Sequence, residues 1–154
     1  GPDDAYLIIR GLRTLDTRLD RHEINTKKIA SFLSKHKKVT VLYPYKKGTT
    51  DYKMWKKYYK GSSGLMGLKI KSKNKISIDR FVNSLKLFGY GYSWGGFESL
   101  ALHQKIREQG KRKYLNLSKD EHIVRLHIGL EDSKDLINDL KRSLKFIKWA
   151  QKSS

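Results

Sequence analysis

The sequence predicts an α+β fold of two layers, with a mostly antiparallel four-stranded sheet, helices packed on one face, and a long N-terminal helix before it. Three observations lead to this prediction. Segments with the apolar period of helices alternate along the chain with short segments that have the two-residue period of strands. The connections are too mixed for a doubly wound sheet with a glycine-rich phosphate loop. The 154 residues, 38% of them hydrophobic, suffice for one domain with a core.

The N-terminal helix is expected to begin at an acidic cap, Asp3 or Asp4, and to end near Ser34. Its apolar residues recur at spacings of three and four, although polar residues interrupt the stripe. A bend is expected near Gly11, because glycine weakens a helix interior. The sequence therefore predicts one long helix, kinked near its start.

The other elements are expected in an alternating order. Their ranges are strands at 39–43, around Met66–Ile70, at 87–90 and at 122–128, and helices from Asp51, at 76–85, at 99–107 and from Asp132 or Ser133 onward. Residues 108–118 are polar and basic, and they are expected to be irregular.

The last predicted strand carries the first candidate site residue. Val124, Leu126 and Ile128 form its apolar face, so Arg125 projects from the opposite face together with His127. A buried arginine needs an anion or a solvated cleft, because an unpaired charge is costly to bury. Two interpretations stay open from the residues alone: an ion pair with a nearby Asp or Glu, or an anion-binding site.

A second candidate feature is the stretch from Tyr92 to Leu100, which is rich in aromatic residues and glycine. The pair Gly95 and Gly96 indicates a tight backbone path that could direct N–H groups at an anion. The alternatives are an ordinary loop with Trp94 in the core and a loop that contacts a ligand.

Charge is the most extreme property of the composition, with a formal net charge of +19. Such a charge is typical of proteins that bind nucleic acid or anionic membranes. However, lysines outnumber arginines 25 to 9 and are scattered along the chain, which favours a solvated lysine-rich surface. Nucleic-acid binding remains an alternative.

Several function classes find no support in the sequence. The chain has no cysteine, which excludes disulfides and thiolate chemistry and fits a cytoplasmic protein. No segment is long and apolar enough to span a membrane, and the start lacks the pattern of a signal peptide. The five histidines are dispersed, so each is interpreted as a surface or packing residue and no metal site is predicted.

Four ordered blocks of sequence carry a family resemblance. They are Arg10-Gly11-Leu12-Arg13-Thr14-Leu15 with Arg18-Leu19, then Gly61-Ser62-Ser63-Gly64, then Tyr92 to Leu100, then Val124 to Asp132. Together they resemble the C-terminal part of the Cys/Met-metabolism pyridoxal-phosphate enzymes, which have the fold type I, aminotransferase-like architecture. Trp94 favours the cystathionine β-lyase branch of that family.

The resemblance implies a function for four residues. Arg125 matches the arginine that binds the substrate α-carboxylate, and Ser93 matches a serine that helps to hold the same group. Tyr92 and Trp94 match residues that line the substrate pocket. For the β-lyase branch, the resemblance implies a reaction that uses pyridoxal phosphate to convert cystathionine to homocysteine, pyruvate and ammonia. The lysine and the other residues that hold this cofactor lie upstream of the matching segment.

The sequence therefore predicts residues 1–36 as a helix linking to a large domain and residues 37–154 as the C-terminal small domain of a transsulfuration enzyme of methionine biosynthesis. Such a truncated chain is expected to have no catalytic residue and no cofactor-binding residue, to bind no pyridoxal phosphate, and to be inactive alone. Its expected partners are an amino-acid substrate, a large domain or a second copy. Two alternatives are a catalytically dead interaction module and a basic nucleic-acid-binding protein.

Overall fold

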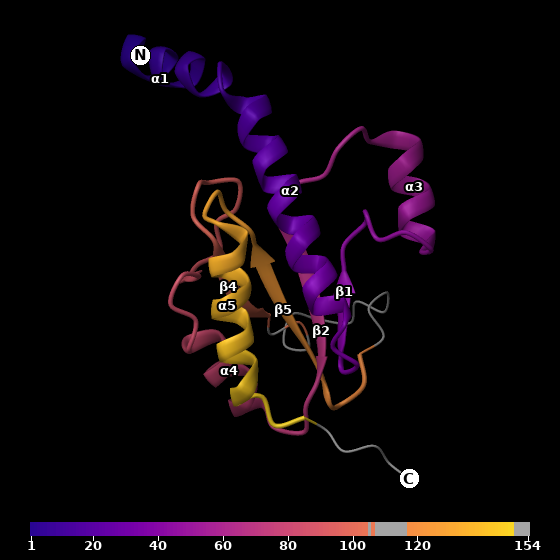
Figure 1. Ribbon diagram of the computed structural model, residues 1–154. Helices are drawn as coiled ribbons and strands as arrows, with labels where there is room; N and C mark the ends of the chain where they lie inside the picture. Colours follow the sequence, from indigo (N-terminus) through magenta and orange to yellow (C-terminus); the bar gives the residue numbers. More distant parts are fainter. Residues whose placement is uncertain (105, 107–116, 150–154) are drawn as a thin grey trace.

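The structure is a computed structural model that describes residues 1–104, 106 and 117–149 (Figure 1). Helices and strands follow one another along the chain. In order, they are α1 (Pro2–Leu12), α2 (Leu15–Ser34), β1 (Val39–Leu42), α3 (Thr50–Tyr58), β2 (Leu65–Lys71), α4 (Lys75–Asn83), β3 (Gly89–Tyr90), β4 (Leu100–Gln104), β5 (Glu121–His127), α5 (Ser133–Ser143) and the short 3-10 helix η3 (Leu144–Phe146). The predicted α+β class is confirmed.

The strands form one sheet in the order β1-β2-β5-β4-β3. Neighbouring strands are antiparallel except β3 and β4, which are parallel. The strand β5 lies in the centre and pairs with β2 on one side and β4 on the other. Arg125 is opposite Gly67 of β2 and Leu102 of β4, so the register fixes the neighbours of this side chain.

The hydrophobic core lies between one face of this sheet and the helices α2, α4 and α5 (Figure 1). Alternation along β5 directs Val124 and Leu126 into this core, as predicted, and both are fully buried. The helices contribute Ile29, Phe81 and Leu136, each also fully buried. The prediction of helices on one face of the sheet therefore holds for these three helices.

The predicted count of four strands is wrong, because residues 100–104 form β4 where a helix was expected over 99–107. Leu100, Ala101 and Leu102 are all buried, so this strand is covered on both faces. A continuous apolar run of this kind has neither the strand nor the helix period, and periodicity alone does not separate the two. Residues 100–104 pair with β5, and this pairing makes the segment a strand instead of a helix. Residues 105 and 107–116, part of the predicted irregular segment, lie outside the described residues.

The bend expected near Gly11 occurs at Arg13 and Thr14, which separate α1 from α2. Arg18 spans the break: its Nη2 donates a hydrogen bond to the Gly11 carbonyl at 2.7 Å, and its Nε donates to Thr14 Oγ1 at 3.4 Å. The Gly11 carbonyl lies in the last turn of α1, where helices leave carbonyl groups without partners. Arg18 therefore stabilises the angle at which α1 projects from the body of the structure (Figure 1).

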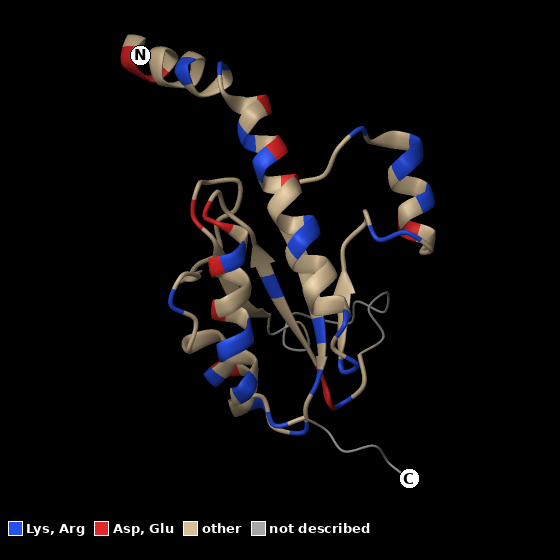
Figure 2. Cartoon of the chain, in the orientation of Figure 1, with Lys and Arg blue, Asp and Glu red and all other residues tan. Residues whose placement is uncertain are grey.

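Lysine and arginine residues occur in each of the helices α1 to α5 and in the strands β2 and β5 (Figure 2). They are not confined to one element, which agrees with a solvated basic surface. In the described part of the chain, no helix has the length and apolar character required to span a membrane.

A buried carboxylate joins α4 to α5. Asp139 of α5 is only 6% exposed, and it accepts hydrogen bonds from the backbone N–H groups of Lys86 and Leu87 at 2.9 and 2.8 Å. It also pairs with Arg142, which donates to the Ser84 carbonyl at 2.7 Å. These contacts fix the chain just after α4 and so set the approach to β3.

We expect Asp139→Ala to destabilise the fold by about 2–4 kcal/mol, because two backbone donors and the Arg142 guanidinium lose their acceptor. Urea unfolding followed by circular dichroism measures this free energy. Asn138→Ala changes an exposed neighbour on α5 and is the matched control, with an expected effect within about 0.5 kcal/mol. Equal stability of the two variants would contradict the assigned role of Asp139.

Candidate functional site

The candidate site is built on residues 91–98 between β3 and β4, which we call the Tyr92 loop. Backbone hydrogen bonds hold both of its ends: Gly89 N donates to Ser99 O at 2.9 Å, and Leu130 N donates to Phe97 O at 2.8 Å. Gly95 has a φ of 83°, in the left-handed region that favours glycine. The unusual backbone path expected from the glycine pair is therefore present at Gly95.

Arg125 reaches this loop from the strand β5. Its Nη2 donates to the carbonyl oxygens of Gly91 at 3.0 Å and Ser93 at 3.2 Å. Among the described residues, no Asp or Glu forms an ion pair with Arg125, so the carboxylate pair that the sequence left open is not found there. The side chain is partly buried and held by one nitrogen against the loop backbone.

The structure brings Arg125 and Ser93 together, but through the Ser93 carbonyl and not its hydroxyl. Tyr92 and Trp94 lie on the same loop with 69% and 65% of their surface exposed. The alternative of a core tryptophan is therefore wrong for Trp94. Phe97 is similarly exposed, so the loop presents three aromatic side chains without partners in the core.

Three residues that the sequence did not single out fix the end of the Tyr92 loop. The Glu131 carboxylate accepts hydrogen bonds from Ser99 N at 2.7 Å and Ser99 Oγ at 2.8 Å. Ser99 Oγ in turn accepts from Gly129 N at 2.8 Å. A Cβ at Gly129 would lie 2.3 Å from the Phe97 carbonyl oxygen, so only glycine permits this approach. The loop is thereby tied to the turn after β5.

Two buried histidines lie beside the loop. His22 of α2 places Nδ1 2.7 Å from the Ile128 carbonyl, and its ring centroid lies 5.2 Å from that of His127. His127 places Nε2 within hydrogen-bond distance of Gly95 and Gly96. Strand alternation had placed His127 on the face of Arg125, and that was the one sequence signal that could have identified it.

Burial lowers the pKa of His127 below its ordinary value, and the neighbouring His22 and Arg125 act in the same direction. The Gly96 carbonyl and Glu131 oppose this shift. The ring is therefore neutral near pH 7, and a neutral imidazole can both donate and accept hydrogen bonds.

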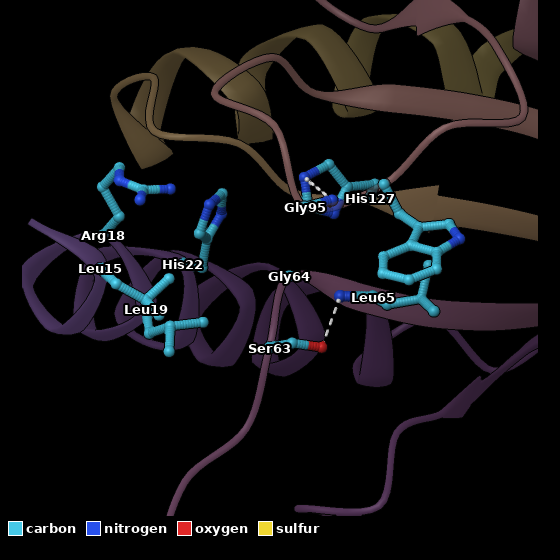
Figure 3. A pocket seen from close by; sticks show the side chains of 10 residues that line it. Leu15, Arg18, Leu19, His22, Ser63, Gly64, Leu65, Gly95 and His127 are labelled. Atoms are coloured by element: carbon cyan, nitrogen blue, oxygen red, sulfur yellow. Dashed lines mark hydrogen bonds between the residues drawn. The ribbon is translucent and has the colours of Figure 1, made fainter. Parts of the chain in front are cut away.

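A pocket of about 270 Å³ opens between α2, the start of β2 and the Tyr92 loop (Figure 3). Apolar side chains dominate its lining, with polar groups from His22, His127 and Arg18. Trp94 and Gly95 line it, whereas Arg125, Tyr92 and Ser93 do not. The predicted site residues thus divide between this pocket and the Arg125 contact beside it. Within the described ranges, no group of three or more His, Asp or Glu residues could hold a metal ion.

Comparison with known proteins assigns this arrangement to a family. The family model for Cys/Met metabolism PLP-dependent enzymes matches residues 1–145. Cystathionine beta-lyase MetC of Escherichia coli is 40% identical over 146 residues, which cover 90% of this chain and 36% of that protein. An L-alanine/L-glutamate racemase of Wolbachia pipientis is 38% identical over 143 residues, covering 92% of this chain and 35% of that protein.

A solved structure agrees with the fold. Cystathionine gamma synthase from Xanthomonas oryzae, in complex with cystathionine, superposes with a TM-score of 0.82 at 32% identity, covering 95% of this chain and 38% of that one. The chain spans little more than a third of the length of these relatives. The matched segment includes α1 to α5 and the whole sheet. The chain therefore belongs to the family of Cys/Met metabolism PLP-dependent enzymes.

Proposed function

We propose that this chain is the part of a pyridoxal-phosphate-dependent carbon–sulfur β-lyase that binds the substrate carboxylate, with a cystathionine-like amino acid as substrate. The proposal includes a division into a linking helix, residues 1–36, and a C-terminal small domain, residues 37–154. A cytoplasmic location stays a prediction. The proposal rests on family membership and on the position of Arg125. Because relatives with lyase and racemase names share this segment, the choice of β-lyase depends on the Trp94 resemblance and the 40% identity to a β-lyase.

One observation carries the proposal: the contacts that hold Arg125 in place use only some of its hydrogen-bond donors. A guanidinium has five N–H donors, and both contacts to the Tyr92 loop use Nη2. The Nε–H and both Nη1–H groups have no acceptor among the described residues. Each of them can donate a single charge-assisted hydrogen bond to a carboxylate, whereas a bidentate contact would also need Nη2 in place of one loop carbonyl. The loop carbonyls therefore orient the guanidinium, and its remaining donors could bind a substrate carboxylate.

The cofactor does not fit the residues present in this chain near Arg125. Pyridoxal phosphate serves as the electron sink for β-elimination and is carried on a lysine in enzymes of this kind. None of the ten residues that line the pocket beside the Tyr92 loop is a lysine. Arg18, which lines the pocket, already binds Gly11 and Thr14. We therefore assign carboxylate binding to this chain and propose that cofactor binding resides elsewhere in the full-length enzyme.

Binding of L-cystathionine to this chain should depend on Arg125. We expect addition of the amino acid to shift the Arg125 Nε resonance in a ¹H–¹⁵N spectrum, and Arg125→Gln to weaken binding by about 10-fold or more, because charge-assisted hydrogen bonds are lost. Arg80→Gln, at an exposed position of α4, is the matched control and should bind as the wild type does. Equal binding by the two variants would remove Arg125 from the proposed site.

This chain alone should show no lyase activity and should not bind pyridoxal phosphate covalently. The measurement is the visible imine absorbance after the cofactor is added, followed by borohydride reduction and peptide mapping. We expect no modified lysine beyond the level of non-specific surface labelling seen with urea-unfolded chain. Stoichiometric reduction at one lysine, with pyruvate released from cystathionine, would show that the chain holds its own cofactor site.

A second candidate function, that of an interaction module, is favoured by the surface of α1. None of the residues of α1 is buried, and its large apolar side chains are exposed. They are Tyr6, Leu7, Ile8, Ile9 and Leu12. An exposed apolar surface of this extent favours association, either with a large domain or with a second copy.

Sedimentation should therefore reveal self-association that increases with protein concentration. We expect the double variant Leu7→Glu/Leu12→Glu to shift the distribution toward monomer, since it places charges among the apolar side chains of α1. The control Arg10→Glu/Arg13→Glu introduces the same number of acidic groups in the same segment without removing an apolar side chain. A strictly monomeric wild-type chain at high concentration would argue against the interaction-module function.

A further inference from the structure

We propose that His127 is a positioning residue, which holds Gly95 and Gly96 so that Ser93 stays against Arg125 and Trp94 stays in the lining of the neighbouring pocket. This inference rests on the proposed function, because the loop that His127 contacts is the loop of the carboxylate site. Arg125 and His127 are two residues apart on β5, so both side chains project from the same face of the sheet. Arg125 contacts the first half of the Tyr92 loop, and His127 contacts the second half.

The contact is made by a single ring nitrogen. His127 Nε2 lies 3.2 Å from the Gly95 N–H donor and 3.1 Å from the Gly96 carbonyl oxygen (Figure 3 shows the Gly95 contact). One tautomer accepts a hydrogen bond from Gly95, and the other donates one to Gly96. The positive φ of Gly95 turns the backbone so that both groups meet the same atom. Either neutral tautomer therefore stabilises this turn.

The imidazole is held rigidly where it can do this. His127 is only 2% exposed. On one side, Gly64 lies so close that a Cβ there would be 2.8 Å from the ring Cε1 and 3.0 Å from Nδ1. On another side lies the ring of His22, which itself contacts the Ile128 carbonyl. Gly64 and His22 thus restrict movement of the ring on two sides and favour its position against the loop.

The other ring nitrogen disfavours the cationic form of the ring. His127 Nδ1 is buried and has no hydrogen-bond partner within the described structure. The cation would still donate from Nε2 to Gly96, but it would bury a positive charge, leave Nδ1–H without an acceptor within the described structure and lose the ability to accept from Gly95. The charged or titratable groups around the ring are His22 and Arg18 from α2, Arg125 from β5 and Glu131 from the turn after β5. Three of these four are basic, and only Glu131 would favour a cationic ring.

The sign of the pH dependence follows from this environment. The folded state lowers the pKa of His127, so the folded chain binds fewer protons there than the unfolded chain does. The contribution of neutral His127 to stability is complete above the ordinary histidine pKa of about 6.5, and it declines as the pH falls from there through the lower pKa of the folded state. We therefore expect the Tyr92 loop to loosen in mild acid as His127 is protonated.

Two substitutions distinguish the effect of the His127 hydrogen bond from the effect of filling the volume of its ring. His127→Gln keeps a side chain that can donate and accept, whereas His127→Leu fills a similar volume without a polar atom. We expect hydrogen exchange at the Gly95 amide to become about 10-fold faster in His127→Leu and to stay within about threefold of the wild type in His127→Gln. His103→Leu, which removes a histidine bonded to Asp79 away from the loop, is the matched control and should leave Gly95 unchanged.

Equal exchange at Gly95 in the wild type and His127→Leu, or equal acceleration in the Leu and Gln variants, would overturn the proposal. Urea unfolding of each variant allows the exchange rates to be corrected for global stability. If His127→Leu does not fold, a pH titration of the wild type alone still tests the proposal. The ¹⁵N resonances of the His127 ring and the exchange of Gly95 should then follow one pH titration, and independent titrations would overturn the proposal.

The same samples distinguish failure of this inference from failure of the proposed function. L-Cystathionine should bind the wild type and His127→Gln with similar affinity and His127→Leu about 10-fold more weakly. Binding to all three with equal affinity would overturn the positioning role while leaving the carboxylate site intact. No binding to any of them, including the wild type, would overturn the proposed function, and the Gly95 exchange data would then report on the loop contact alone.

Discussion

The arrangement of this chain depends on the central position of β5 in the sheet. Its backbone pairs with β2 on one side and β4 on the other, so its two faces are fixed along its whole length. One face contributes Val124 and Leu126 to the core beneath the helices. The other face directs Arg125 and His127 at the Tyr92 loop. A shift of one residue in the register would exchange these two faces, and it would lose both the core and the candidate site together.

The candidate site follows from this constraint through backbone contacts. Arg125, His127 and Glu131 each bind main-chain groups in or next to the Tyr92 loop, at successive positions along it. Contacts of this kind fix the path of a loop without using its side chains. They leave Tyr92 and Trp94 exposed and leave donors of Arg125 without an acceptor among the described residues. A rigid strand that preorganises a loop in this way is what a binding site for a small anionic group requires.

Part of the exposed apolar surface borders the pocket beside the Tyr92 loop. Leu15 and Leu19, near the start of α2, line the same pocket as Trp94 (Figure 3). The elbow between α1 and α2 is held by Arg18, which also lines that pocket. Surface of this kind is uncommon on isolated domains, and it suits a chain that spans about a third of the length of its relatives. Under the proposed function, the apolar helix and the aromatic loop are the surfaces expected to meet the cofactor-carrying part of a full-length enzyme.

The sequence by itself predicted the N-terminal helical region, four of the five strands in the sheet, the last helix, and the side of the sheet from which Arg125 projects. Its ordered motifs also indicated the family. Tertiary structure alone decided β4, because Leu100, Ala101 and Leu102 are buried on both faces and show no period. It also decided the contacts of Glu131 and His127 with the Tyr92 loop, since about 30 residues of sequence separate the partners. Local patterns describe faces and periods, whereas contacts between distant segments arise only when the sheet brings them together.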